Sequence, residues 1–308
     1  MLDKRYGLIT FKSLGKKGNL GNQLFQIAST IGIAKKNGHE VVFPEWPYAK
    51  NFNYNFQFYK EDDFQFKQIV ENSYAFHEWN LDSGNFDVNG ALQSEKYFER
   101  AFTKQVFEFK RDFLNKILEK HQYLFKKKTI FISVRRGDFV YHPDYYQLPY
   151  QYYFLALKEN FPDWKERNLI FTSDDIKYCK YHFGFLDNAI FLENLSAIEQ
   201  LAVSSQGEDF IISNSTFSWW CAWLGEKENS KIIRPLKNFR GEIAKINDDS
   251  DYFPERWIPF DFKKRNIELK YLGLIIKGRS FQIFDFTHFA LTQSVLFLKK
   301  IINKVFHK

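Results

Sequence analysis

FISVRRGDF, residues 131 to 139, is a run of strand-forming residues that ends in two adjacent arginines, a glycine and an aspartate. Neighbouring side chains on a strand point to opposite faces, so Arg135 and Arg136 can enter one site only if the strand ends there, and Gly137 predicts that ending. A guanidinium is a planar fork of donors that keeps its charge. It suits a diphosphate and can neutralise a phosphate leaving group without a metal. The alternative is that one arginine pairs with Asp138 and the other is a solvated surface group.

The segments on both sides of this strand alternate between strand and helix patterns. Strands are predicted at 7–14, 39–44, 127–134, 168–174, 189–194, 208–215 and 231–235, and helices at 21–38, 101–121, 149–161, 175–183, 195–206 and 216–227. Residues 48–100 are aromatic and rich in Asn and Gln, without a clear period, and they are not placed. The alternation predicts an α/β fold with parallel sheets and helices on both faces.

Two such blocks, separated near residue 125, predict two Rossmann-like domains that face each other across a cleft. We expect an N-terminal domain at 1–125, a second domain at 126–260 and a basic helical tail at 261–308. Ligands should then gather at the carboxyl ends of the strands.

Two further strand ends carry polar side chains that suit a nucleotide. An apolar strand runs into Ser213, Asn214, Ser215 and Thr216, and an aromatic helix that contains Ser218 follows. Such residues cap a helix and leave its N-terminal N–H groups directed at a phosphate, although plain capping is the alternative. Ser173 and Asp174 follow the strand at 168–174, where an acid can bind a ribose hydroxyl or a base edge, or can simply open a helix.

The glycines at 15, 18 and 21 raise the rival prediction of a dinucleotide-binding loop. Their spacing is G-x-x-G-x-x-G instead of G-x-G-x-x-G, and Glu40 precedes the second strand instead of ending it. A nicotinamide enzyme is therefore not favoured, although the glycines still predict a close approach of the backbone to a ligand or to the facing domain.

Composition and charge exclude several classes of protein. The 308 residues are 44% hydrophobic, the two cysteines are far apart, and no segment has the spacing of a metal site. The tail holds ten Lys or Arg against three acids, an excess of seven that equals the net charge of the chain, so residues 1–260 are neutral. That argues against a nucleic-acid-binding body. The absence of a signal-peptide pattern predicts a cytoplasmic protein.

Four motifs together resemble one family. GNLGNQLFQIA at 18–28, LQSEKYF at 92–98, VRRGDF at 134–139 and SNSTFSWWCAWL at 213–224 are similar to the ordered motifs of the bacterial α-1,2-fucosyltransferases of glycosyltransferase family 11. The resemblance covers roughly residues 7–260. It implies a GT-B fold, GDP-fucose as donor, no divalent metal, inversion at the anomeric carbon, and a galactose hydroxyl of a glycan as acceptor.

The resemblance also implies roles for individual residues. Arg135 and Arg136 match the arginine pair expected at the donor diphosphate, with Arg135 helping GDP to leave. The residues expected at the nucleoside are Ser173 and Asp174; those expected at the phosphates are Asn214, Ser215, Thr216 and Ser218; those expected on the acceptor side are Asn22, Gln23, Gln93, Glu95 and His142. The family's His-x-Arg-Arg has Ser133 in place of the histidine, so any role of that imidazole is absent or moved.

The general base stays open at this point. Inversion in one displacement requires the acceptor hydroxyl to lose a proton as it attacks. Asp138 is the first candidate because it lies beside the arginines, followed by His142, Asp144 and Glu95. Charge neutralisation by arginine could instead dominate the rate.

The tail allows two interpretations. Residues 283–308 are apolar at first and gather lysines at the end, and they are too short and too charged to span a bilayer. They could lie on an anionic membrane surface, which would bring the enzyme to a lipid-linked glycan on the inner face of the cytoplasmic membrane, or they could pack on the core. A transferase for another GDP-sugar, or a glycan-binding protein without catalysis, are the alternatives for the whole chain.

Overall fold

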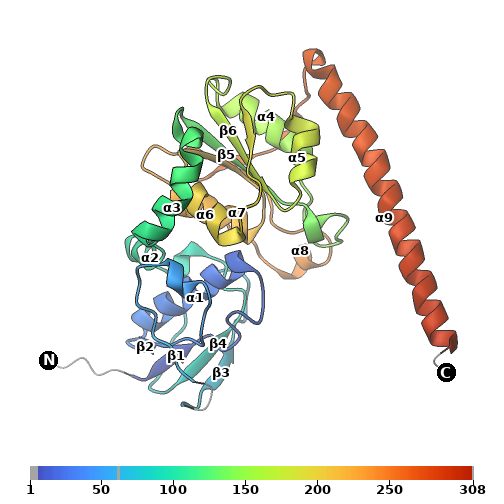
Figure 1. The fold of residues 1–308 in the computed structure, drawn as a ribbon. Helices are drawn as coiled ribbons and strands as arrows, with labels where there is room; N and C mark the ends of the chain where they lie inside the picture. Colours follow the sequence, from blue (N-terminus) through green and yellow to red (C-terminus); the bar gives the residue numbers. More distant parts are fainter. Residues whose placement is uncertain (1–5, 61–62, 307–308) are drawn as a thin grey trace.

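The computed structural model describes residues 6–60 and 63–306 of the chain, and it contains two parallel sheets, one above the other (Figure 1). The first sheet has the order β2 (Glu40–Val41), β1 (Leu8–Thr10), β4 (Phe86–Asn89) and β3 (Lys67–Val70). The second has the order β10 (Ile258–Phe260), β9 (Ile232–Pro235), β8 (Asp209–Ile212), β5 (Thr129–Val134), β6 (Asn168–Ser173) and β7 (Ala189–Phe191). All the strand pairs are parallel. The predicted α/β class is confirmed, and the domain boundaries themselves stay a prediction.

The second sheet carries helices on both faces, as the alternation predicted. Its helices are α4 (Tyr150–Asn160), α5 (Ile176–Phe183), α6 (Ala197–Ser204) and α7 (Thr216–Gly225), and a short α8 (Ile243–Ile246) follows β9. Ile130 and Ile132 of β5 pack in the cluster of α4 and α5, while Phe131 between them packs in the cluster of α6 and α7. The strand order reverses between β5 and β8, which predicts a ligand crevice at the carboxyl ends of those two strands.

The first sheet is less regular than predicted. Only β1 and β2 are joined by a long helix, α1 (Leu20–Lys36), and β3 and β4 come from the segment that the sequence left unplaced. The helix expected at 101–121 is two helices, α2 (Arg100–Val106) and α3 (Arg111–His121). Backbone hydrogen bonds from Asn53 to Glu108 and from Lys110 to Asn51 hold the intervening residues extended, which breaks the helix.

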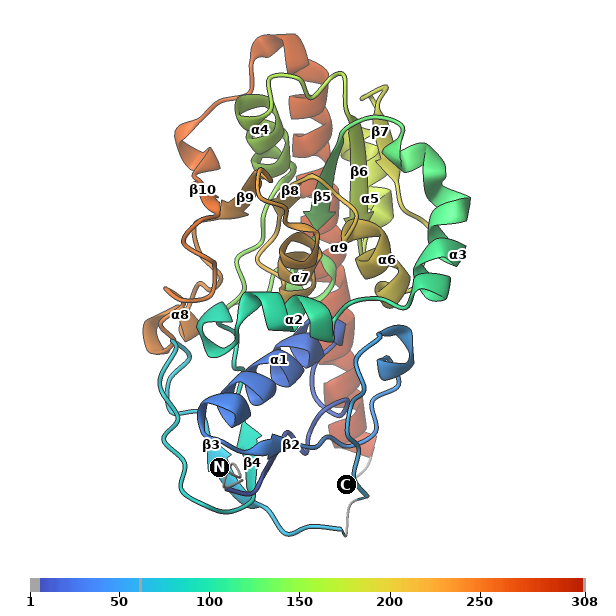
Figure 2. The ribbon, with the colours of Figure 1, turned by 90° about the vertical axis from the view of Figure 1, so that its left-hand side faces the viewer.

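The two sheets share one hydrophobic core. Figure 2 shows α1 lying between the first sheet and α7, and the two helices are in contact. The Phe25 ring of α1 lies 4.5 Å from the Trp219 ring and 5.1 Å from the Trp220 ring of α7. A Cβ on Gly21 would lie 2.4 Å from the Phe217 backbone nitrogen, so the helices approach as closely as the glycine allows. The tryptophans of α7 are therefore core residues and not a stacking surface.

The tail forms α9 (Leu272–Phe306), which runs along one side of the molecule (Figure 1). Its first turns pack on the second domain: Leu274 is buried, and a Cβ on Gly278 would lie 2.0 Å from the Tyr150 ring. Over the part of the chain that the structure describes, no helix is long and apolar enough to cross a membrane. His307 and Lys308 of the predicted tail lie outside the described residues.

Candidate functional site

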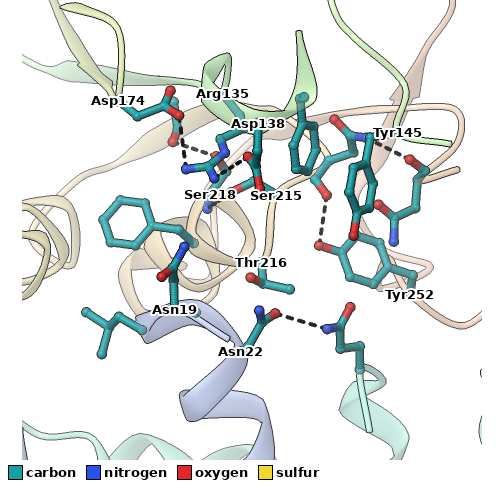
Figure 3. A pocket seen from close by; sticks show the side chains of 18 of the residues that line it. Asn19, Asn22, Arg135, Asp138, Tyr145, Asp174, Ser215, Thr216, Ser218 and Tyr252 are labelled. Carbon is teal, nitrogen blue, oxygen red and sulfur yellow. Dashed lines mark hydrogen bonds and ion pairs between the residues drawn. The ribbon is translucent and has the colours of Figure 1, made fainter. Parts of the chain in front are cut away.

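A cavity of about 570 Å³ opens between the two sheets, at the carboxyl ends of β5, β6 and β8 (Figure 3). The N-terminal turns of α1 and α7 also border it. Eleven of the predicted site residues line this cavity: Asn22, Gln23, Gln93, Arg135, Asp138, Ser173, Asp174, Asn214, Ser215, Thr216 and Ser218. The residues predicted from the strand ends therefore lie around one cavity, and their roles in it stay a prediction.

Arg135 lies at the centre of this arrangement, between two carboxylates (Figure 3). Its Nη2 is 2.5 Å from Asp138 Oδ1 and its Nη1 is 3.0 Å from Asp174 Oδ2. Gly137 has φ +20°, and a Cβ there would lie 2.3 Å from Asp174 Oδ2. The chain turns at Gly137, after both arginines, and the two carboxylates fix the direction of the Arg135 guanidinium.

The start of α7 is a cluster of small hydroxyl residues. Ser215 is the N-cap, and its Oγ accepts the Ser218 N–H at 3.3 Å. The Ser218 Oγ lies 2.7 Å from Ser133 Oγ and 2.8 Å from Ser213 Oγ. Ser133, where the resemblance implies a histidine, is thus a buried hydroxyl that braces the helix start.

Two helices present their positive ends to the same cavity. The first turns of α1, at Asn19 to Gly21, and of α7, at Thr216 to Ser218, both line it. The free N–H groups and the macrodipole of each helix favour an anion there. Arg135 adds a guanidinium to these two helix ends, while Asp138 and Asp174 also line the cavity. Anion binding would therefore depend on the directions of these donors and not on a net positive charge.

A chain of hydrogen bonds joins the two sheets across the floor of the cavity. Gln93 donates to Asn22 Oδ1 at 3.1 Å and accepts from the Tyr74 hydroxyl at 2.7 Å. Tyr74 in turn accepts from Asn238 at 2.9 Å, and the Asn238 carbonyl accepts from Asn214 at 2.7 Å. Burial raises the pKa of Tyr74 well above its ordinary value, so the hydroxyl stays protonated and keeps donating.

The loop that carries Gln93 is held by a buried carboxyl group. Glu71 accepts the backbone N–H groups of Ala91 at 2.7 Å and Leu92 at 3.1 Å, and Leu92 has φ +52°. Burial raises the pKa of Glu71 to about 7. The position of this loop therefore depends on a group that changes its charge near neutral pH.

Several lining residues were not predicted. Tyr74 and Tyr48 come from the unplaced segment, Asn238, Phe239, Ile243 and Asn247 follow β9, and Ala197 and Gln200 open α6. Gln200 and Thr172 are hydrogen-bonded to each other beside Ser173. The sequence carries no signal for Tyr48 and Tyr74. The others follow predicted strands, a place that is shared by many loop residues.

Gln23 reaches the cavity but uses both ends of its amide to hold the fold. Its Oε1 accepts from the Trp46 indole at 2.9 Å, and its Nε2 donates to the Gly18 carbonyl at 2.9 Å.

Four predicted residues do not line the cavity: Arg136, Glu95, His142 and Asp144. Arg136 is 4% exposed and points away from Arg135, because neighbouring side chains on an extended backbone diverge and Gly137 turns the chain one residue too late. Glu95 accepts from Trp223 at 3.0 Å and pairs with Arg256 at 2.5 Å. His142 accepts the Asp144 N–H at 3.1 Å instead of facing the site.

Within the described residues, no three His, Cys, Asp or Glu side chains are grouped as metal ligands.

Comparison with known proteins identifies relatives of this chain. The model of "Glycosyl transferase family 11" matches residues 10–259. An O-antigen biosynthesis glycosyltransferase, WbnK of Escherichia coli, is 30% identical over 167 residues, which are 50% of this chain and 53% of the relative. An alpha-1,2-colitosyltransferase of Escherichia coli is 32% identical over 143 residues, 42% of this chain and 47% of the relative. The match spans about half the length of each of these relatives.

Solved structures of fucosyltransferases share the fold. POFUT1 in complex with GDP has a TM-score of 0.51 at 12% identity and covers 74% of this chain and 98% of its own. FUT1 of Arabidopsis thaliana in complex with GDP has a TM-score of 0.52 at 12% identity. The match covers 85% of this chain and 78% of the FUT1 chain. The predicted GT-B fold is therefore confirmed, and the family match extends over most of both sheets. The chain belongs to glycosyltransferase family 11.

Proposed function

We propose that this chain is an inverting glycosyltransferase that moves L-fucose from GDP-fucose to the 2-hydroxyl of a galactose, β-linked in a glycan such as an O-antigen or capsule repeat. The observation that carries the proposal is the convergence of Arg135 and the N-terminal turns of α1 and α7 on one cavity. Helix N-termini and a guanidinium are groups that bind a diphosphate. The family match and the name of WbnK support a glycan as acceptor.

The donor would lie along the carboxyl edge of the second sheet. Arg135 and the first turn of α7 bind the diphosphate, while Ser173 and Asp174, with Gln200 of α6, lie where the nucleoside would extend. Asn22 and Gln93, on the opposite wall, face the acceptor.

In the transfer, the acceptor oxygen attacks the anomeric carbon from the face opposite the leaving group. The bond from that carbon to the phosphate oxygen breaks, and GDP leaves with the electron pair. Arg135 and the helix ends neutralise the growing charge on the diphosphate, so no divalent metal is needed. Asp138 lines the cavity with a side chain that is 62% exposed, and it is our candidate to accept the acceptor proton.

A second donor is favoured by one observation. The relative named an alpha-1,2-colitosyltransferase indicates that this architecture also serves another sugar. Such a change would alter the pocket around the sugar ring and leave the diphosphate site intact.

Nucleotide release by the purified protein tests the proposal. The donors are GDP-fucose, GDP-colitose, GDP-mannose and UDP-galactose, each with a β-galactoside, with and without EDTA. We expect release from GDP-fucose that requires the acceptor and is indifferent to EDTA, with an α-1,2 product identified by NMR. Release from another donor alone would overturn the substrate, release only with metal would overturn the mechanism, and no release from any donor would favour a glycan-binding protein.

We also propose that the protein is cytoplasmic and that its tail contacts an anionic membrane, near a lipid-linked acceptor. The exposed side chains Ile276, Ile283 and Phe284 on α9 support this, as do the lysines that end the sequence. Replacing Lys299, Lys300 and Lys304 by Gln should weaken binding to phosphatidylglycerol vesicles by about a hundred-fold. Binding to neutral phosphatidylcholine vesicles should stay weak in both proteins. Equal binding of the variant and the unchanged protein to the anionic vesicles would exclude the membrane contact.

A further inference from the structure

Arg136, the second arginine of the pair, connects the tail helix to the second domain. Its Nη2 lies 2.9 Å from Asp285 Oδ2 of α9, and its Nε lies 3.2 Å from Asp175 Oδ2 at the start of α5. The guanidinium lies 4.1 Å from the centre of the Tyr178 ring and 5.2 Å from that of Phe281. This buried cation is therefore held by a carboxylate and a ring from each of two helices.

The same residue is joined through its backbone to the catalytic arginine. The Arg136 N–H donates to Asp174 Oδ1 at 2.9 Å, and the other oxygen of Asp174 pairs with Arg135 at 3.0 Å. The Arg136 carbonyl accepts the N–H groups of Phe139 at 2.7 Å and Val140 at 3.1 Å, which closes the turn that carries Asp138. A shift of Arg136 would therefore move both carboxylate partners of Arg135.

A second contact fixes the end of this turn to α9. Tyr141 has φ +55°, and its ring lies 4.5 Å from the Phe289 ring and 6.1 Å from the Phe286 ring. A non-glycine residue in this conformation is strained and needs surrounding contacts to hold it there. In the described structure those ring contacts come from α9.

We propose that Arg136 and Asp285 are positioning residues, through which the tail helix sets the geometry of the 135–141 turn and so of Arg135. The inference rests on the proposed function for its activity readout. A cation that is 4% exposed cannot easily lose one of its two carboxylates, because the charge would stay buried and partly unpaired. The turn must then move to hydrate the guanidinium. These contacts of α9 thus help to position the turn beside the cavity, so the tail helix is more than an appended anchor.

The test compares Asp285→Asn with a matched control, Glu268→Gln, which neutralises another acid of the tail that pairs with Lys158 and Lys270. We expect Asp285→Asn to lower kcat by about ten-fold, whereas Glu268→Gln changes it less than two-fold. Asp285→Glu should restore most of the activity. In the double variant Arg136→Lys/Asp285→Asn, the loss of kcat should be much smaller than the losses of the two single variants multiplied together.

Hydrogen exchange supplies a readout that does not depend on activity. The amides of residues 135–141 should exchange about ten-fold faster in Asp285→Asn than in the unchanged protein, while those of β5 and β8 stay protected. Unchanged exchange in this turn, or faster exchange spread evenly over the chain, would overturn the proposal. If the unchanged protein transferred no sugar at all, the proposed function would fail, and exchange would still decide whether α9 holds the turn.

Discussion

Arg135→Ala is expected to lower the rate of sugar transfer by about 10³-fold while the protein stays folded. The guanidinium borders the cavity beside the starts of α1 and α7. In the proposed reaction, the leaving diphosphate gains charge there. Alanine removes the guanidinium N–H groups that could bind the phosphate oxygens. It also leaves Asp138 and Asp174 as two unneutralised carboxylates beside an anionic substrate. The loss should therefore exceed that of a single hydrogen bond.

Steady-state kinetics with GDP-fucose, together with the midpoint of thermal unfolding, check this expectation. Arg135→Lys keeps the charge without the fork and should recover only part of the rate. Arg111→Ala, at the exposed start of α3, is the matched control and should leave both quantities unchanged. Full turnover by Arg135→Ala would remove the arginine from the mechanism. Asp138→Asn should have a smaller effect if charge neutralisation dominates the barrier.

The second sheet could be predicted from sequence because its strands are short apolar runs between helices of regular period. The run IFISV in β5 is buried on both faces, as central parallel strands are, and so it stands out. The first sheet lacks that signal. The strand KQIV of β3 is mostly exposed and follows a long irregular aromatic segment, so its pairing with β4 depends on contacts between residues far apart in the chain.

The site was predictable to the extent that topology fixes it. Strand ends brought Arg135, Asp174 and Ser215 together because the carboxyl ends of parallel strands meet at one edge of the sheet. The direction of a side chain after a strand end was not predictable. Arg136 points to α9, and the partner that draws it there, Asp285, is 149 residues further along the chain.

Trp220→Ala should destabilise the protein by about 4 kcal/mol and lower the midpoint of thermal unfolding by about 10 °C. The Trp220 side chain is fully buried in α7, and its ring contacts Phe98 at 5.7 Å, Phe25 at 5.1 Å and Phe107 at 5.2 Å, all from the first 125 residues. Its indole N–H has no hydrogen-bond partner in the described part of the chain. The loss of stability therefore comes from packing alone, where α7 meets the first 125 residues.

Thermal and urea unfolding followed by circular dichroism measure the effect. Trp220→Phe keeps an aromatic ring between the two sheets and should lose less than half as much free energy of unfolding. Phe284→Ala, at a side chain of α9 that is 71% exposed, should change the free energy of unfolding little. Because the core cluster is continuous across both sheets, the variant should still unfold in one transition. Two separate transitions would mean that the sheets fold independently. A single transition would mean that the packing of α1 on α7 makes the two sheets one cooperative unit.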